Sequence, residues 1–478
     1  MNELNIPGRL NRLPMSRFLG ICMALISLGV FWDTYMLYSI GPLSSQFVES
    51  THQAQLATQI PTALFLGTFI GAMALGRIAD KIGRSKAFTL NLTILAAGAV
   101  WAALSPVNFL LLVAIFAAGI GTGSEIPLCV TYVQEISPSQ RRGRLSSLAL
   151  AVGFIGGTAG GLVAAGLSRA HNLPIPGFRI GLLIAAAGAV VTIFMRLRMP
   201  ESPRWLERTG RYEQAEAVMI RIEAAVMRER GLARLPDPEP VTEVTPATRP
   251  TITLLKPAYL RRTMSAWLIE LFQGFGSYGF TTFVPVILYA RGYNLVQAVG
   301  YTALIQISYP VGTYLSSFVT DRVPRKWGIA AFFTLNTATG IGFYFATANW
   351  LILLFGFLTS MLIFMDGPLL HTYEAEVYPT DLRGRGAGAA FSISRLGGFL
   401  APLAASAIIG ALGTHTAGPY LVAIAAGSWL ACAIIAALLA VDTSAPSLEQ
   451  LAEAERPTTS TARGHCQERD FAEVKGSS

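Results

Sequence analysis

The sequence predicts an all-α integral membrane protein in which twelve transmembrane helices form two pseudo-symmetric six-helix halves. Three observations support this prediction. Of the 478 residues, 52% are hydrophobic and only 13% are charged, whereas soluble globular proteins are about 25% charged. Apolar runs repeatedly reach the roughly 20 residues that a helix needs to cross a bilayer. Finally, one stretch of sequence occurs twice at a fixed separation.

The repeated stretch covers residues 125–144 and 366–385, which are identical at nine of their 20 positions. A second pair of residues keeps the same separation, because Asp80 and Arg84 recur as Asp321 and Arg325, 241 positions later. An internal repeat of this kind indicates one structural unit used twice. The chain is therefore expected to consist of two copies of one half.

The apolar runs predict six membrane helices in the first half, at 17–42, 58–79, 87–106, 109–134, 145–169 and 178–198, and six in the second, at 263–289, 296–319, 327–347, 350–377, 386–411 and 419–441. Helices are expected because lipid cannot satisfy free backbone groups and these runs are too long for barrel strands. The predicted organisation is an N-terminal tail at 1–16, a first half at 17–198, a linker at 199–262, a second half at 263–441 and a C-terminal tail at 442–478.

The long connection between the halves has its own pattern. Residues Tyr212–Arg230 combine mixed charge with apolar side chains at helical spacing, which predicts a surface helix. The Pro- and Thr-rich stretch 236–250 predicts a linker without regular structure. The tail after Asp442 is polar and is expected to be disordered beyond a short helix near 448–455.

The placement of Lys and Arg predicts the orientation in the membrane. Of the 36 basic residues, 32 fall in segments on the same side as the N-terminus, and only three fall on the other side. Positive residues stay preferentially in the cytoplasm, so both termini are expected there, with the protein in the inner or plasma membrane. The net charge of +8 therefore reflects topology, and no nucleic-acid partner is expected.

Composition and motifs argue against catalysis. The four cysteines lack metal-ligand spacing, and the soluble segments carry no catalytic Ser/His/Asp grouping, metal motif or nucleotide-binding loop. We therefore expect no enzyme activity, no cofactor and no metal. The expected partners are a small-molecule substrate, a proton and membrane lipid, and the protein is expected to be a monomer.

Two motifs carry a family resemblance. The loop Gly76–Arg84 holds Asp80 and Arg84 one helical turn apart, and it resembles the loop signature of the major facilitator superfamily. Its second copy carries Pro324 where the signature has glycine. In that family, charge clusters are thought to lock the inward gate. The resemblance therefore implies a gating role for Asp80, Arg84, Glu135, Arg142, Asp321, Arg325, Glu376 and Arg383.

A third motif, Pro200-Glu201-Ser202-Pro203-Arg204-Trp205-Leu206, resembles the segment that follows helix six in sugar porters and their organic-ion relatives. This resemblance covers residues 17–441. It implies the major facilitator fold, in which each half is built from inverted three-helix repeats, and transport by alternating access.

Ionisable residues inside the membrane are the main clues to function, because a charge there costs several kcal/mol and needs a partner or a purpose. The candidates for proton coupling are Asp33, Glu125, Asp366 and Glu270. Asp33 resembles the helix-one aspartate of proton-coupled symporters. Sugar symporters pair that aspartate with an arginine in helix four, whereas this chain has Ile115 at that place.

The candidate substrate-binding residues are Arg395, Gln273, Asp366, His371 and Tyr35. Arg395 is about 15 Å deep in its helix, where it could clamp a substrate carboxylate or form an internal ion pair with Asp366 or Asp33. Its surroundings resemble helix eleven of aromatic-acid and related metabolite/proton symporters. Further aromatic residues that could line the cavity are Trp32, Tyr38, Phe154, Phe275 and Tyr278.

Three functions fit these residues. The first is proton-coupled uptake of a carboxylated or aromatic solute. The second is efflux of an organic cation or drug, which the four intramembrane acids favour. However, Gly157 stands where drug/proton antiporters have a helix-five proline. The third is sugar uptake, which is weakened because Asp366 and His371 replace the tryptophans of helix ten in sugar porters. A sensor without flux would also fit the fold, but the chain lacks a large signalling domain.

Overall fold

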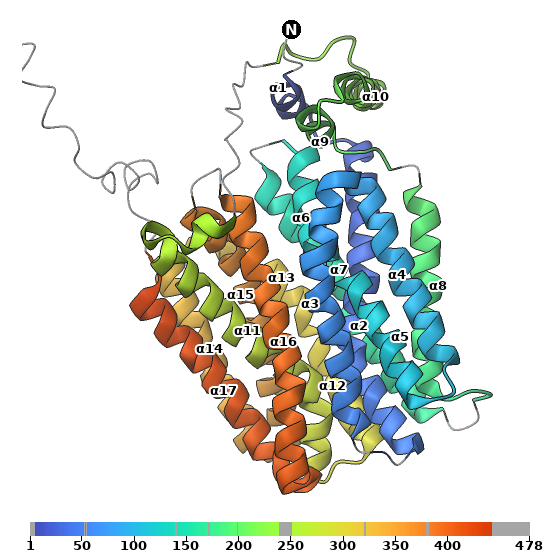
Figure 1. Ribbon diagram of the computed structural model, residues 1–478, viewed down its shortest axis with the longest axis vertical. Helices are drawn as coiled ribbons and strands as arrows, with labels where there is room; N and C mark the ends of the chain where they lie inside the picture. Colours follow the sequence, from blue (N-terminus) through green and yellow to red (C-terminus); the bar gives the residue numbers. More distant parts are fainter. Residues whose placement is uncertain are drawn as a thin grey trace, which may run out of the picture.

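The computed structural model describes residues 5–441 except 52, 54, 139–140, 171–172, 198, 239–250, 320–321 and 379–381. The elements in this part of the chain are helices, with no strand among them. They form two helical bundles that lie side by side, and a small group of helices lies at one end of the molecule, over the first bundle (Figure 1). We call this end the linker end. The arrangement confirms the predicted all-α fold class.

The first bundle consists of α2 (Arg17–Thr51), α3 (Leu56–Ile82), α4 (Arg84–Leu104), α5 (Asn108–Thr122), α6 (Glu125–Ile136), α7 (Arg142–Arg169) and α8 (Gly177–Arg196). The second consists of α11 (Pro257–Ala290), α12 (Leu295–Gln306), α13 (Ser308–Val319), α14 (Arg325–Phe345), α15 (Asn349–Val377), α16 (Arg383–Leu412) and α17 (Thr414–Leu439). If α5 with α6 and α12 with α13 each count as one broken span, each bundle has six spans.

Ten helical segments in the described residues are long and apolar enough to cross a membrane. The two predicted spans outside this set are α12 with α13, which is interrupted at Ile307, and α14, which carries Asn336 and several threonines. The threonine hydroxyls of α14 donate to carbonyls of the preceding turn, for example Thr334 to Ala330 at 2.8 Å. These polar side chains are therefore compatible with a membrane helix.

Both helix interruptions have a packing reason. At the α5/α6 break, Gly123 lies so close to the backbone of α3 at Thr68 that a Cβ there would overlap it. At the α12/α13 break, the free carbonyl of Gln306 accepts a hydrogen bond from the Thr158 hydroxyl in the other half, at 2.6 Å. The Gln306 amide in turn donates to the Tyr38 carbonyl at 2.9 Å. The breaks therefore form where two helices approach closely.

The halves meet in the middle of the bundle and toward the end remote from the linker. In this region Gly41 of α2 packs on the backbone of α11 at Thr282, and Gly157 of α7 packs beside Tyr309 of α13. Helices α3 and α16 also pack on each other across the interface. These contacts between the two halves therefore close the bundle at the end opposite the linker.

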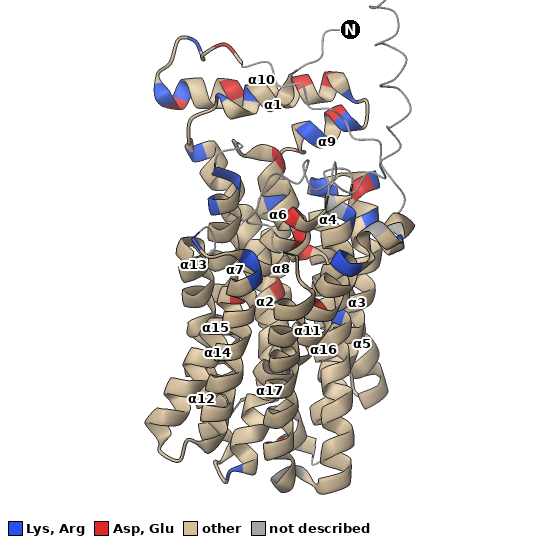
Figure 2. Cartoon of the chain, turned by 90° about the vertical axis from the view of Figure 1, so that its left-hand side faces the viewer, with Lys and Arg blue, Asp and Glu red and all other residues tan. Residues whose placement is uncertain are grey.

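Charged residues concentrate at the linker end, whereas the rest of the bundle is almost free of them (Figure 2). This end is covered by α1 (Ile6–Asn11), α9 (Pro203–Arg208) and α10 (Tyr212–Arg230). Helix α10 has the bounds that its charge and apolar pattern predict. Its apolar face packs with α1 and α9 in a small core that includes Leu10, Trp205, Met219 and Ile222.

Ion pairs reinforce this cap. The Arg9 guanidinium lies 2.8 Å from Glu223 of α10, and Arg12 lies 2.6 Å from the same carboxylate. Burial opposes ionisation of Glu223, but the hydrogen bonds from Arg9 and Arg12 dominate and lower the pKa of this carboxyl. The N-terminal segment is therefore docked on the linker helix by both apolar packing and charge.

Candidate functional site

The residues predicted to form the gate, here called the gate residues, make ion pairs in both halves. In the first half, Arg84 contacts Glu135 at 3.1 Å and Asp80 at 2.6 Å. In the second half, Arg325 contacts Glu376 at 3.2 Å. Each second-half residue lies 241 positions after its counterpart, so the repeat seen in the sequence is present as repeated contacts. Asp321 and the side chain of Arg383 lie outside the described residues, and Arg142 donates to the Ser137 carbonyl at 3.3 Å.

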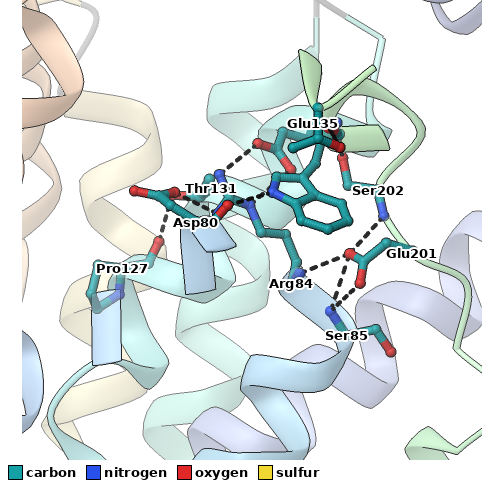
Figure 3. A network of polar contacts seen from close by, with 10 residues as sticks. Asp80, Arg84, Ser85, Pro127, Thr131, Glu135, Glu201 and Ser202 are labelled. Carbon is teal, nitrogen blue, oxygen red and sulfur yellow. Dashed lines mark hydrogen bonds and ion pairs between the residues drawn. The ribbon is translucent and has the colours of Figure 1, made fainter. Parts of the chain in front are cut away.

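The linker binds directly to the first gate. The Glu201 carboxylate reaches the first turn of α4 and accepts hydrogen bonds from the backbone N–H groups of Arg84 at 2.8 Å and Ser85 at 3.2 Å (Figure 3). Nearby, the Trp205 indole donates to the Asp80 carbonyl at 2.9 Å. Burial raises the pKa of Glu201, although these backbone donors oppose the shift. The post-helix-six motif thus caps α4 beside the gate.

Glu125, a predicted proton-coupling residue, forms a buried ion pair with Arg196 at 2.8 Å. Asn91 of α4 also donates to this carboxylate, at 3.2 Å. Arg196 further donates to the carbonyls of Leu25 and Ile26 in α2. Arg196 was not singled out from the sequence, because it lies at the very end of α8, where basic residues are common at the cytoplasmic side of a membrane helix. The proton-coupling role of Glu125 stays a prediction.

The Arg196 side chain packs against Gly29 of α2. A Cβ at that position would overlap both the Arg196 guanidinium and the Glu125 carboxylate. The Arg196 guanidinium also lies over the Phe88 ring, 4.5 Å from its centroid. Glycine at position 29 therefore lets α2 approach the pair and supply the two carbonyl acceptors.

Asp366 is the second-half counterpart of Glu125 but lacks an arginine. The Asn336 amide donates to it at 3.3 Å, which parallels the contact of Asn91 with Glu125. Its other carboxylate oxygen is buried without a hydrogen-bond partner. The position 241 residues after Arg196 is Ala437, so the second half has no equivalent cation. The two halves share the acid–amide contact and differ in the charge that balances it.

Asp33 lies on α2, inside the bundle. Its side chain is 1% exposed. Within the part of the chain that the structure describes, neither of its carboxylate oxygens has a hydrogen-bond partner. An ionised carboxylate in such a place would cost several kcal/mol. Of the four acids predicted to couple protons, Asp33 is the one for which the described residues provide no hydrogen bond to either carboxylate oxygen.

Six aromatic rings from both halves meet between the bundles, and we call them the aromatic cluster: Tyr38, Phe65 and Phe154 from the first half, and Tyr278, Tyr309 and Phe364 from the second. Tyr309 and Phe364 stack at 4.1 Å between centroids. Tyr38 lies 5.0 Å from Tyr309, and Phe65 lies 5.0 Å from Tyr278. Gly157 leaves room for the rings of Tyr38 and Tyr309. Phe65, Tyr309 and Phe364 were missed, since nothing in their local sequence separates them from lipid-facing aromatics.

Arg395 of α16 lies at the edge of the aromatic cluster and is 1% exposed. Its guanidinium donates to the Tyr278 hydroxyl, and it lies 5.2 Å from the Tyr278 ring centroid and 4.8 Å from that of Phe391. Its Nε is buried without a partner. Within the described residues Arg395 forms no ion pair, so the predicted ion pair with Asp33 or Asp366 is absent from this conformation.

The remaining predicted binding residues lie in three places. Gln273 of α11 accepts a hydrogen bond from Ser394, the neighbour of Arg395, at 3.1 Å. His371 lies 3.3 Å from Glu374 on α15. Tyr35 instead faces α8, where its hydroxyl donates to the Gly181 carbonyl at 3.2 Å. Gln273 therefore contacts the residue next to Arg395, and the binding roles of all these residues stay predictions.

Comparisons with known proteins agree with this architecture. The model of the Major Facilitator Superfamily matches residues 21–402 and, in a second match, 307–473. The chain belongs to the Major Facilitator Superfamily. It is therefore a multi-pass membrane transporter of small molecules and not an enzyme.

Relatives within the superfamily cover most of the chain. The inner membrane metabolite transport protein YdjE of Escherichia coli is 27% identical over 460 residues, which are 94% of this chain and 98% of the relative. The niacin transporter NiaP of Acinetobacter baylyi is 28% identical over 402 residues, which are 84% of this chain and 89% of the relative. Among solved structures, a partially occluded inward-open xylose transporter XylE of E. coli matches with a TM-score of 0.69 and 16% identity, covering 91% of this chain and all of that one.

Proposed function

We propose that this transporter carries a small planar aromatic carboxylate across the membrane together with a proton. The observation that carries the proposal is Arg395, a buried arginine beside the aromatic cluster without an ion-pair partner in the described residues. A buried cation needs an anionic partner, and a guanidinium binds a carboxylate through two parallel hydrogen bonds. A substrate carboxylate would supply that partner.

The aromatic cluster accounts for the rest of the substrate. Its rings come from both halves, so a flat ring that inserts between them would contact both halves at once. Offset or edge-to-face contacts between aromatic rings contribute about 0.5–1.5 kcal/mol beyond the area they bury. A relative named as a niacin transporter supports the same chemistry, because niacin is a planar aromatic carboxylate.

Asp33 is the proposed carrier of the coupling proton. It is buried without hydrogen-bond partners, and a carboxyl group in such surroundings is more stable with a proton bound. Once the other conformation exposes Asp33 to water, the group can ionise and release the proton. Substrate and proton thereby cross together.

The linker end is proposed to face the cytoplasm, because most Lys and Arg residues lie there. The contacts between the halves described above lie in the middle of the bundle and toward the other end, while each gate ion pair stays within its own half. The described conformation is therefore proposed to be open toward the cytoplasm. Alternating access would then require the linker ends of the two halves to close on each other.

Uptake into proteoliposomes tests this function. Labelled benzoate or nicotinate should accumulate when the outside is acidic and the inside alkaline, and Asp33→Asn should abolish the response to the pH gradient while the protein still binds substrate. Accumulation driven equally well without a pH gradient would contradict proton coupling. Transport of a sugar or an organic cation, with no transport of any aromatic acid, would overturn the substrate class.

A further inference from the structure

The second half contains a cluster of three metal-ligating side chains that the proposed function does not use. It consists of Glu270 on α11 and of His371 and Glu374 on α15, with one potential ligand atom from each residue within 4.8 Å of the others. We propose that this cluster is a binding site for a divalent transition-metal ion of the Zn²⁺ class, held by one imidazole nitrogen and two carboxylate oxygens.

The first argument is uncompensated charge. Glu270 and Glu374 are 2% and 1% exposed, and each has a carboxylate oxygen that is buried without a hydrogen-bond partner. Within the described residues neither acid forms an ion pair with Lys or Arg, in contrast to Glu125, which has Arg196. The two carboxyl groups are hydrogen-bonded to each other, which requires one of them to hold a proton when no cation is bound, because two neighbouring carboxylates repel each other. One divalent cation would neutralise both.

The second argument is geometry. His371 and Glu374 are three positions apart on one helix, and Glu270 comes from the neighbouring helix. Helix bundles build metal sites from a Glu-x-x-His pair on one helix and further acids from facing helices. Here the two residues have the same spacing in the reverse order, with His371 before Glu374. His371 Nδ1 and Glu374 Oε2 are 3.3 Å apart. That is close to the spacing of about 3.4 Å between two ligands of a tetrahedral ion with bonds of about 2.1 Å.

The donor set and the access route indicate the class of ion. Imidazole favours Zn²⁺ and its transition-metal neighbours over Mg²⁺ and Ca²⁺, which prefer all-oxygen sites. The His371 side chain is 37% exposed, whereas Glu374 behind it is almost fully buried. An ion could therefore enter past the imidazole and keep a water molecule on that side. Sequence spacing could not show this site, because Glu270 lies about a hundred positions before the other two ligands.

Zn²⁺ binding to the purified full-length protein, freed of any histidine tag and measured by isothermal titration calorimetry, tests the proposal. We expect one saturable site per chain. His371→Ala and Glu374→Gln should each weaken it at least about tenfold, as loss of a ligand does elsewhere. Glu213→Gln, which removes an exposed acid on α10, outside the second half, should leave the affinity unchanged.

Three outcomes of this titration would contradict the proposal. The proposal is overturned if no saturable Zn²⁺ binding occurs, if both cluster variants bind as tightly as the unmodified protein, or if Glu213→Gln weakens binding to the same extent. Because His371 is partly exposed, His371→Ala is expected to fold even if a change at a buried glutamate does not, and size-exclusion profiles would verify this. The readout is metal binding, so it stands independently of whether the substrate proposal holds.

Discussion

At the scale of single residues, the two halves of the repeat stabilise equivalent buried acids in different ways. Glu125 and Asp366 occupy equivalent positions and each contacts an asparagine of the neighbouring helix. Only Glu125 also has an arginine, and Arg196 is in turn held by two backbone carbonyls of α2. We infer that Glu125 stabilises the folded protein, whereas Asp366 is available for another role.

This difference predicts unequal effects of two matched substitutions. Glu125→Gln leaves Arg196 buried without a counter-charge and should cost about 3–5 kcal/mol of stability. Asp366→Asn keeps an oxygen for the Asn336 amide and should cost less than about 1 kcal/mol. Thermal unfolding of the purified variants measures both. Equal losses, or a stable Glu125→Gln variant, would contradict the assignment of Glu125 to the ion pair.

At the scale of elements, the cap at the linker end ties three segments together. Helix α1 docks on α10 through Arg9, Arg12 and the apolar core. The linker also holds the first turn of α4 through Glu201. Since α4 begins with the gate residue Arg84, the cap and the gate belong to one connected unit. Movement of the gate is therefore expected to be transmitted to the cap.

The lowered pKa of Glu223 predicts that docking of α1 depends on pH. The stabilisation is present above the ordinary pKa of a glutamate, about 4.3. It is lost as the pH falls through the lower pKa of the docked state, because protonation removes the charge that Arg9 and Arg12 bind. The expected loss is about 1–3 kcal/mol, the contribution of hydrogen bonds to a charged group.

Hydrogen exchange of the α1 amides would measure this effect. Protection should fall on acidification in the unmodified protein, and Glu223→Gln should show low protection at every pH. Glu213→Gln is the matched control, because Glu213 lies on the same helix but is exposed. If Glu223→Gln retains full protection at neutral pH, the ion pairs do not hold α1.

At the scale of the whole molecule, the fold follows from sequence features that span many residues, whereas the site does not. The 241-residue offset and the apolar runs predict two six-span halves, and the gate pairs Arg84–Glu135 and Arg325–Glu376 recur at that offset. Long apolar runs constrain the chain because lipid leaves the backbone few alternatives.

The site depends on contacts between distant helices, which local sequence cannot reveal. Arg196 could not be recognised as a partner of Glu125, because the two residues lie 71 positions apart. The rings of Tyr309 and Phe364 join the aromatic cluster only because α13 and α15 are neighbours. Arg395 could be singled out from the sequence, because a charge in the middle of an apolar helix is rare on its own.

The central claim is that Arg395 and the aromatic cluster select a planar aromatic carboxylate. Calorimetric binding of nicotinate and of nicotinamide to the purified protein tests it most directly, since the two ligands share a ring and differ in charge. The unmodified protein should prefer the acid by at least about tenfold, the lower end of what a hydrogen bond to a charged group contributes. Arg395→Gln should remove this preference and leave binding of the amide unchanged. Equal affinities in the unmodified protein, or a preference that survives Arg395→Gln, would contradict the account.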